Sequence, residues 1–305
     1  MKISIVVLTW NRRDCLIETL SNLSSLEAEI VVVDNGSEDG TSEAVEKYFP
    51  DCQLVSLSEN LGTVARNDGI SKASGDIIIT LDDDVRSLTQ AGIQQVIKSF
   101  ENPKLGALTF KVINPGTGKT RDWVHRQRIS CADETFPTYE ITEGAVAFRA
   151  RALKDSGLYR NDYFISHEGL DLAYRLLNSG WEIYHNGSIT VEHYHDPGGR
   201  TDWRRYYYDT RNLFWISARF HPLSYAVPYL FRGILAMTFY AIRDMHILAF
   251  TRGFFDGLGG INKAARCRTP WTDFTTEWCK KVDSYSPGFF YLVKRRIFSK
   301  NFNLD

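Results

Sequence analysis

Four short apolar runs alternate with helical segments in the first 81 residues, and this alternation constrains the fold more than any other feature. The runs are rich in Val, Ile and Leu and cover residues 4–8, 29–33, 52–56 and 76–81. The segments between them, 13–23, 42–48 and 63–73, are predicted helices. Continuous apolar strands separated by helices form a mostly parallel sheet with helices on both faces. We therefore predict an α/β fold that binds its ligands at the carboxyl ends of the strands.

The later part of the chain changes character after residues 197–199, Pro-Gly-Gly. Before them we predict helices at 90–100 and 170–178, and strands at 107–112, 144–148, 181–184 and 188–192. After them aromatic residues and arginines dominate, from residue 203 to 240. We predict a catalytic α/β domain over residues 1–200 and a helical extension, basic and aromatic, over residues 201–305.

Charge and cysteine content limit the function classes. From residue 201 onward, 16 Lys and Arg against 8 Asp and Glu give a net charge of +8, which leaves −9 for the first 200 residues. An acidic body favours a bound cation, and a basic tail favours an anionic contact such as a membrane surface. The five cysteines are scattered and form no CxxC pair, so we expect no disulfide framework or zinc site, and a cytoplasmic protein.

Three consecutive carboxylates, Asp82, Asp83 and Asp84, follow the fourth apolar run. Such groups repel one another, and a divalent cation that prefers oxygen ligands relieves the repulsion. In an extended chain Asp82 and Asp84 point the same way and Asp83 the other. We predict that Asp82 and Asp84 hold Mn²⁺ or Mg²⁺ against a diphosphate. A solvated acidic turn is the alternative.

Two other segments carry polar residues suited to a nucleotide. Asp34 ends the second run, before an Asn-Gly turn, and can accept a hydrogen bond from a pyrimidine N–H. Arg66 follows Gly62 by one helical turn and can pair with a phosphate or a base carbonyl. The alternatives are a turn former for Asp34 and a helix-surface salt bridge for Arg66.

These three segments, in this order after Ser4-Ile5-Val6-Val7-Leu8-Thr9-Trp10-Asn11-Arg12, resemble the family 2 glycosyltransferases of the Rossmann-like GT-A fold. The resemblance covers about residues 3–195. It implies that Thr9 and Asp34 contact the base and that Asp82 and Asp84 match the family's DxD motif for metal and diphosphate. The donor-binding set that we predict on this basis is Thr9, Asn11, Asp34, Arg66, Asp82 and Asp83.

The resemblance continues in two later segments, with one departure. Residues 167–176 resemble the family's segment in which a Glu-Asp pair supplies the catalytic base, but the second position here is Gly169. The base is therefore Glu168 or Asp171, which lie about one helical turn apart. Capping of the helix, with Asp171 paired to Arg175, is the structural alternative. His193 matches a metal-ligating histidine at the end of the last strand, and an imidazole with carboxylates suits Mn²⁺.

The implied reaction is an inverting transfer of a sugar from a UDP- or dTDP-sugar to a hydroxyl of a glycan or glycolipid, in cell-surface polysaccharide assembly. A sugar-1-phosphate nucleotidyltransferase has a related fold, but it opens with a glycine-rich loop where Thr9-Trp10-Asn11-Arg12-Arg13 stands here. The missing GxGxxG motif at the same turn argues against a nicotinamide dehydrogenase. A non-catalytic sugar- or nucleotide-binding protein is the alternative that is not an enzyme.

The extension combines aromatic rings with cations, as in residues 203–208, and contains an apolar stretch over 223–250. Rings at the headgroup level and cations facing anionic phosphates are typical of an interfacial membrane contact. We therefore expect a peripheral position on the inner face of the plasma membrane and a lipid-linked acceptor. Packing on the catalytic domain or a homodimer interface is the alternative. We expect no nucleic-acid partner, because the three aspartates repel phosphates unless a metal intervenes.

Overall fold

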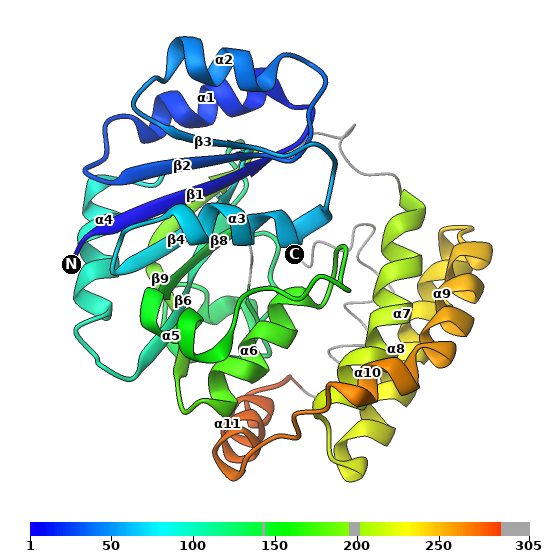
Figure 1. Cartoon of the computed structure of the whole chain (residues 1–305). Helices are drawn as coiled ribbons and strands as arrows, with labels where there is room; N and C mark the ends of the chain where they lie inside the picture. The colour runs from blue at the N-terminus through cyan, green and yellow to red at the C-terminus, as the bar shows by residue number, and fades with distance from the viewer. Residues whose placement is uncertain (142–143, 195–201, 288–305) are drawn as a thin grey trace.

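The computed structural model describes residues 1–141, 144–194 and 202–287 of the 305-residue chain. Within these residues, nine strands form one twisted sheet with helices on both faces, followed by a group of helices beside it (Figure 1). The strand order is β3-β2-β1-β4-β8-β6-β9-β5, and β7 pairs with β9. The predicted α/β fold with a helical extension is confirmed.

The first half of the sheet follows the predicted pattern closely. Its strands run parallel, because a helix returns the chain to the starting edge after each strand. These elements are β1 (Ile3–Thr9), α1 (Arg13–Leu23), β2 (Glu29–Asp34), α2 (Thr41–Tyr48), β3 (Gln53–Ser56), η1 (Gly62–Ala65), α3 (Arg66–Lys72) and β4 (Ile77–Asp82). Thr9 pairs with Asp34, and Leu8 with Asp82, so the polar ends of three strands meet at one edge.

The second half makes the sheet mixed, whereas a mostly parallel sheet was expected. Strand β8 runs antiparallel to both β4 and β6. The two strands expected at 181–184 and 188–192 are one strand with a register shift. The elements are β5 (Val85–Arg86), α4 (Gln90–Ser99), β6 (Leu105–Ile113), η2 (Ile129–Cys131), β7 (Thr135–Pro137), β8 (Ala145–Arg149), α5 (Ala150–Ser156), α6 (Glu168–Asn178) and β9 (Glu182–His193).

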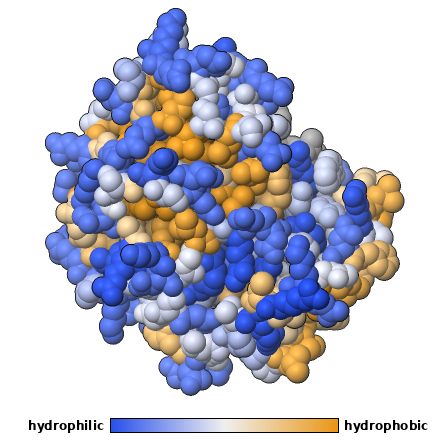
Figure 2. All heavy atoms as spheres, viewed as in Figure 1, coloured by the Kyte–Doolittle hydropathy of each residue, from blue (hydrophilic) through white to orange (hydrophobic). Residues whose placement is uncertain are grey.

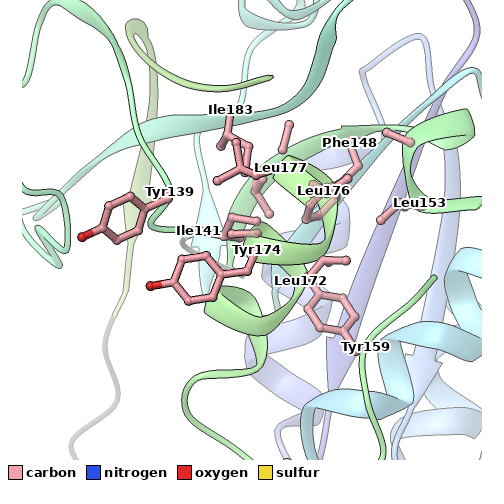
Figure 3. Packing of buried hydrophobic residues seen from close by; sticks show 14 of the residues in the cluster. Tyr139, Ile141, Phe148, Leu153, Tyr159, Leu172, Tyr174, Leu176, Leu177 and Ile183 are labelled. Atoms are coloured by element: carbon pink, nitrogen blue, oxygen red, sulfur yellow. The ribbon is translucent and has the colours of Figure 1, made fainter. Parts of the chain in front are cut away.

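Two apolar cores lie on opposite faces of the sheet. Because side chains alternate along a strand, Val6 of β1 joins one core while Ile5 and Val7 join the other. Helices α1, α2 and α4 cover the second face. Helices α3, α5 and α6 cover the first, where Leu172, Leu176 and other side chains of α6 pack beneath the sheet (Figure 3).

Some of the C-terminal helices reach the first core, and others pack in a smaller core of their own. The C-terminal helices are α7 (Asp202–Phe220), α8 (Leu223–Arg243), α9 (Ile247–Gly259), α10 (Ile261–Arg266) and α11 (Asp273–Ser284). Helix α11 returns to α6, and its Trp278 is part of the first core and donates a hydrogen bond from Nε1 to the carbonyl of Thr138 (2.9 Å). Tyr139 likewise donates to Asp283 (2.6 Å). The expected boundary at residue 200 lies outside the described residues, and α7 and α11 after it bury side chains in the core of the α/β domain.

Candidate active site

Two arginine side chains and one hydroxyl group contact the three carboxylates at the end of β4. Arg12 contacts Asp83 Oδ1 (2.8 Å) and Asp84 Oδ2 (2.9 Å) through one guanidinium nitrogen, and Thr9 donates to Asp83 Oδ2 (2.8 Å). Burial raises the pKa of Asp83 to about 7, although Arg12 and Thr9 favour its charged form. Arg12 thus holds the carboxylates of Asp83 and Asp84 together, whereas an extended chain would have pointed them in opposite directions, because residues 83 and 84 form a turn and not a strand.

Asp82 points toward a different set of residues. Arg66, which is almost fully buried, pairs with its carboxylate. The alternative considered for Arg66 was a salt bridge on the helix surface. Arg66 does form a salt bridge, but a buried one. Gly144 approaches Asp82 so closely that a Cβ at this position would come within 2.5 Å of Asp82 Oδ2, so a larger residue would displace the carboxylate. Thr142 and Glu143, the preceding residues of that segment, lie outside the described part of the chain.

His193 reaches the acids because the short strand β5 pairs with the end of β9, with Val85 opposite His193. Its Nε2 lies 3.1 Å from Asp84 Oδ1, and its Nδ1 lies 2.7 Å from Asp122 Oδ2. One potential ligand atom from each of Asp82, Asp84 and His193 lies within 4.8 Å of the others. The structure thus brings together the three residues that the sequence suggested as metal ligands.

This group of residues fits a divalent cation. Two carboxylates and an imidazole are ligands that Mn²⁺ accepts. Asp122 contacts Nδ1 and leaves Nε2 turned toward Asp84, which is how a second carboxylate usually orients a metal-binding histidine. Burial alone would lower the pKa of His193, but its hydrogen bonds with Asp122 and Asp84 raise it to about 10. Sequence reasoning missed Asp122, which lies in a loop without any recognisable motif.

The nucleotide-binding residues expected near β2 lie in a network of turns. Asp34 is buried and accepts hydrogen bonds from the Ser37 N–H (2.9 Å) and the Ser42 hydroxyl (2.5 Å). Asn11 accepts one from the Glu38 N–H (2.7 Å). These contacts are those of the turn-forming alternative, and they hold the ends of β1 and β2 together beside the acids.

Gly62 connects this network to the loop before α6. Its φ of +73° and the close approach of Phe164 require glycine, because a Cβ would come within 2.2 Å of the Phe164 carbonyl oxygen. The next residue, Thr63, donates its N–H to the same oxygen (3.0 Å). The nucleotide side of the site is therefore in direct contact with the loop that leads to Glu168.

Glu168 is a buried carboxylate at the N-terminus of α6. Among the described residues, its Oε2 has no hydrogen-bond partner. Burial raises its pKa, and this effect outweighs Arg66 and a hydrogen bond with Thr63, which both favour the charged form. Ser166 and His167, just before it, have φ values of +72° and +66°, which are unusual for residues other than glycine. Such backbone strain clusters at functional sites.

Asp171 has entirely different surroundings, although it lies less than one helical turn from Glu168. It is fully buried. Three guanidinium nitrogens surround its carboxylate: Arg175 Nε (2.7 Å), Arg160 Nε (3.3 Å) and Arg219 Nη1 (3.8 Å). Its charge is thus balanced by arginines from three separate segments. The pairing of Asp171 with Arg175 that was considered from the sequence is present.

The model of the family described as glycosyl transferase family 2 matches residues 4–158, which is half of the chain. The chain belongs to glycosyl transferase family 2. The matched residues include Thr9, Asp34, Arg66 and the whole acidic run, so the family resemblance predicted from these segments is confirmed. Family 2 membership also argues against the nucleotidyltransferase alternative.

Curated members of family 2 resemble the chain over part of their length. The poly-beta-1,6-N-acetyl-D-glucosamine synthase of Staphylococcus epidermidis is 28% identical over 199 residues, covering 59% of this chain and 47% of the synthase. The uncharacterized glycosyltransferase YfnE of Bacillus subtilis is 34% identical over 109 residues, covering 33% and 28%. The chain thus spans about half the length, or less, of these two relatives.

Solved structures confirm the GT-A fold. TarS of S. aureus in complex with UDP-GlcNAc matches with a TM-score of 0.60 at 18% identity, covering 87% of this chain and 82% of TarS. The mannosyltransferase PcManGT of Pyrobaculum calidifontis, solved with GDP-Man and Mn²⁺, matches with a TM-score of 0.58 at 17% identity, covering 98% and 88%. The second match includes the C-terminal helices as well as the sheet.

Proposed function

We propose that this chain is a metal-dependent, inverting glycosyltransferase that moves a sugar from a UDP- or dTDP-sugar to a hydroxyl of a glycan or lipid-linked glycan in cell-surface polysaccharide assembly. The observation that carries the proposal is the convergence of Asp82, Asp84 and His193 at the carboxyl edge of the sheet. The relatives support the class of reaction, since one is a poly-beta-1,6-N-acetyl-D-glucosamine synthase and a structural neighbour was solved with UDP-GlcNAc.

The donor lies, in this proposal, along the carboxyl edge of the sheet. Thr9, Asn11 and Asp34 are at the end of the edge where the base would bind, and Arg66 provides a guanidinium for the diphosphate. Asp82, Asp84 and His193 would hold the metal ion, Mn²⁺ or Mg²⁺. When bound there, such an ion supplies positive charge that stabilises the departing diphosphate.

Glu168 is the proposed general base. It accepts the proton of the acceptor hydroxyl as that oxygen bonds to the anomeric carbon and the bond from that carbon to the diphosphate breaks. A single displacement of this kind inverts the anomeric configuration. Burial suits Glu168 to the role, because the higher pKa that it causes makes the carboxylate a stronger proton acceptor. We assign the base to Glu168 and not to Asp171, because the charge of Asp171 is already balanced by three arginines.

We also propose a cytoplasmic position on the inner face of the plasma membrane, where a lipid-linked acceptor is found. The five cysteines are all free, as expected in a reducing compartment. The acceptor then shares one surface with the enzyme.

The test is release of nucleoside diphosphate from a panel of UDP-, dTDP- and GDP-sugars, with Mn²⁺, Mg²⁺ or a chelator. We expect release that requires a metal ion and falls by at least 10²-fold in Asp84→Asn. Asp14→Asn is the matched control, because Asp14 is exposed on α1 and pairs with its neighbour Arg13. Full activity with the chelator would contradict the metal site. Pyrophosphate formation from a sugar phosphate and a nucleoside triphosphate would instead show a nucleotidyltransferase.

A further inference from the structure

Helix α8 carries an apolar face that nothing in the described part of the chain covers. Six side chains with three- or four-residue spacing form it, and they are between 42% and 81% exposed. Residues three or four apart are neighbours on the surface of a helix, so side chains with this spacing form one continuous stripe. We call it the α8 apolar face, and it consists of Leu223, Val227, Phe231, Leu235, Phe239 and Ile242.

The apolar surface continues beyond the end of α8. Met245 and Leu248, in the turn and the start of α9, are more than 80% exposed. Figure 2 shows apolar residues gathered along the edge of the molecule where α8 and α9 lie in Figure 1. Single exposed apolar residues are ordinary, but a continuous patch of this length marks a binding surface.

The opposite side of α8 ties it to the rest of the fold. Ala226, Met237, Tyr240 and Ala241 are buried, and the helix packs against α7 and α9. By length and composition alone α8 could cross a membrane, and 22% of its most apolar 18-residue window is buried in the protein. A helix that is packed on one side and apolar on the other is suited to lie along an interface, with its packed side held to the protein.

The charge of α8 distinguishes two candidate occupants of this face, a second copy of the chain and an anionic lipid surface. Helix α8 contains two arginines and no acidic residue. Arg243 pairs with Asp244 just after the helix, whereas Arg232 is exposed between Phe231 and Leu235. Exposed cations follow in α10, at Lys263 and Arg266. A second copy of the chain in a symmetric dimer would set an apolar face that contains Arg232 against an identical one. Anionic lipid headgroups would instead provide the opposite charge beside an apolar layer.

We propose that the α8 apolar face docks on an anionic lipid surface, with the aromatic and aliphatic side chains in the acyl boundary and Arg232 among the headgroups. The helix lies along the membrane and does not cross it, since its other side is packed against α7 and α9. This inference rests on the membrane position in the proposed function and names the residues that make the contact. It does not depend on the assignment of any catalytic residue.

The test is co-sedimentation of the full chain with phosphatidylglycerol–phosphatidylcholine vesicles. We expect binding at low salt that weakens as salt rises and is absent with phosphatidylcholine alone, because screening reduces the charge attraction. The double variant Phe231→Glu/Leu235→Glu should bind at least tenfold more weakly. Tyr48→Glu, an exposed aromatic position on α2 at the other end of the molecule, is the matched control and should bind as the parent does.

Two further readouts separate the outcomes. Circular dichroism and thermal melting of the double variant should match the parent, because both substituted positions are exposed. Nucleoside diphosphate release from a soluble donor should also be unchanged, since neither position is in the candidate site. A parent protein that ignores anionic vesicles and sediments as a dimer, converted to a monomer by the double variant, would overturn the proposal in favour of a second copy. Vesicle binding without any sugar-nucleotide turnover would contradict the proposed function and support the lipid-binding role of the α8 apolar face.

Discussion

At the scale of single residues, Glu168 and Asp171 show how two acids in one helical turn can have opposite roles. Both are buried, and each has one oxygen without a hydrogen-bond partner among the described residues, but three arginines surround the carboxylate of Asp171 alone. A buried and poorly compensated carboxylate costs stability, and proteins keep such groups where function needs them. A buried carboxylate surrounded by arginines is part of the scaffold.

The first prediction is that Glu168→Gln loses activity without losing stability. The rate should fall by about 10² to 10⁴, because the amide cannot accept a proton, while donor affinity is kept. In the parent enzyme, the rate should fall as pH is lowered through the Glu168 pKa, which burial raises above the usual range of a glutamate. Steady-state kinetics across pH and donor binding by calorimetry would measure both effects.

The stability side of this prediction has a definite sign. The folded state binds the Glu168 proton more tightly than the unfolded chain, so this residue contributes less to stability as pH rises through its folded pKa. Gln carries no such charge, so Glu168→Gln should melt at the same temperature as the parent or higher at neutral pH. A variant with the parent's activity would show that the base is elsewhere.

The second prediction concerns Asp171→Asn. Removing this charge leaves Arg160, Arg175 and Arg219 close together without their shared partner, and breaking a buried ion pair costs about 3–5 kcal/mol. The free energy of unfolding, measured in urea, should fall by about that amount, and any activity loss should follow the loss of folded protein. If Asp171→Asn is as stable as the parent and inactive, the assignment of the base to Glu168 is wrong.

The sequence singled out Asp82, Asp84 and His193, which the structure places together, but it could not distinguish the surroundings of Glu168 and Asp171. Asp82, Asp84 and His193 each end a predicted strand, so their meeting follows from the fold. The difference between Glu168 and Asp171 depends on Arg160 and Arg219, which other segments bring near, and no local pattern shows this. Asp122 was missed for the same reason, because the loop after β6 brings it to His193.

At the scale of elements, helix α7 positions the loop before the proposed base. Asn212, fully buried, donates from Nδ2 to the carbonyls of Ile165 (3.0 Å) and Ser166 (2.6 Å). Ser166 also donates to Asp209 of the same helix. Because Ser166 and His167 have positive φ, the loop needs such contacts to keep its conformation.

The third prediction is that Asn212→Ala lowers kcat by about tenfold or more, because small displacements of a catalytic group are costly. The donor KM should change little, since Asn212 contacts none of the nucleotide-binding residues. Asn262→Ala, at an exposed position of α10, is the matched control. A change in donor KM with kcat intact would contradict a positioning role for α7.

Local elements were largely predictable from the sequence, and their pairing was only partly so. The bounds of α1 agree with the prediction, and those of β1 differ by one residue at each end, because apolar periodicity is a local property. The antiparallel entry of β8 depends on the path of the chain between residues 114 and 144, which has no strong periodicity. The placement of α11 on α6 depends on long-range packing and was not predicted.

At the scale of the whole molecule, the C-terminal helices pack on the α/β domain through α7 and α11. The fourth prediction is that Trp278→Ala lowers the free energy of unfolding by about 3–5 kcal/mol, because a buried tryptophan is lost from the core shared with α6. Trp203→Ala, at an exposed position of α7, should change it little. Denaturant unfolding followed by circular dichroism measures both free energies of unfolding. If Trp278→Ala lowers the free energy as little as Trp203→Ala does, α11 is dispensable for the fold.

The return of α11 to α6 also has a consequence for synthesis on the ribosome. Elements emerge in chain order, and the half of the sheet that holds Thr9, Asp34 and the acidic run is complete early. The contacts that place the Glu168 loop come from α7, and the cover for α6 comes from α11, about 110 residues after Glu168 itself. The nascent chain therefore completes the edge that holds Thr9 and Asp34 first, and the contacts between α6 and α11 form only after α11 has emerged.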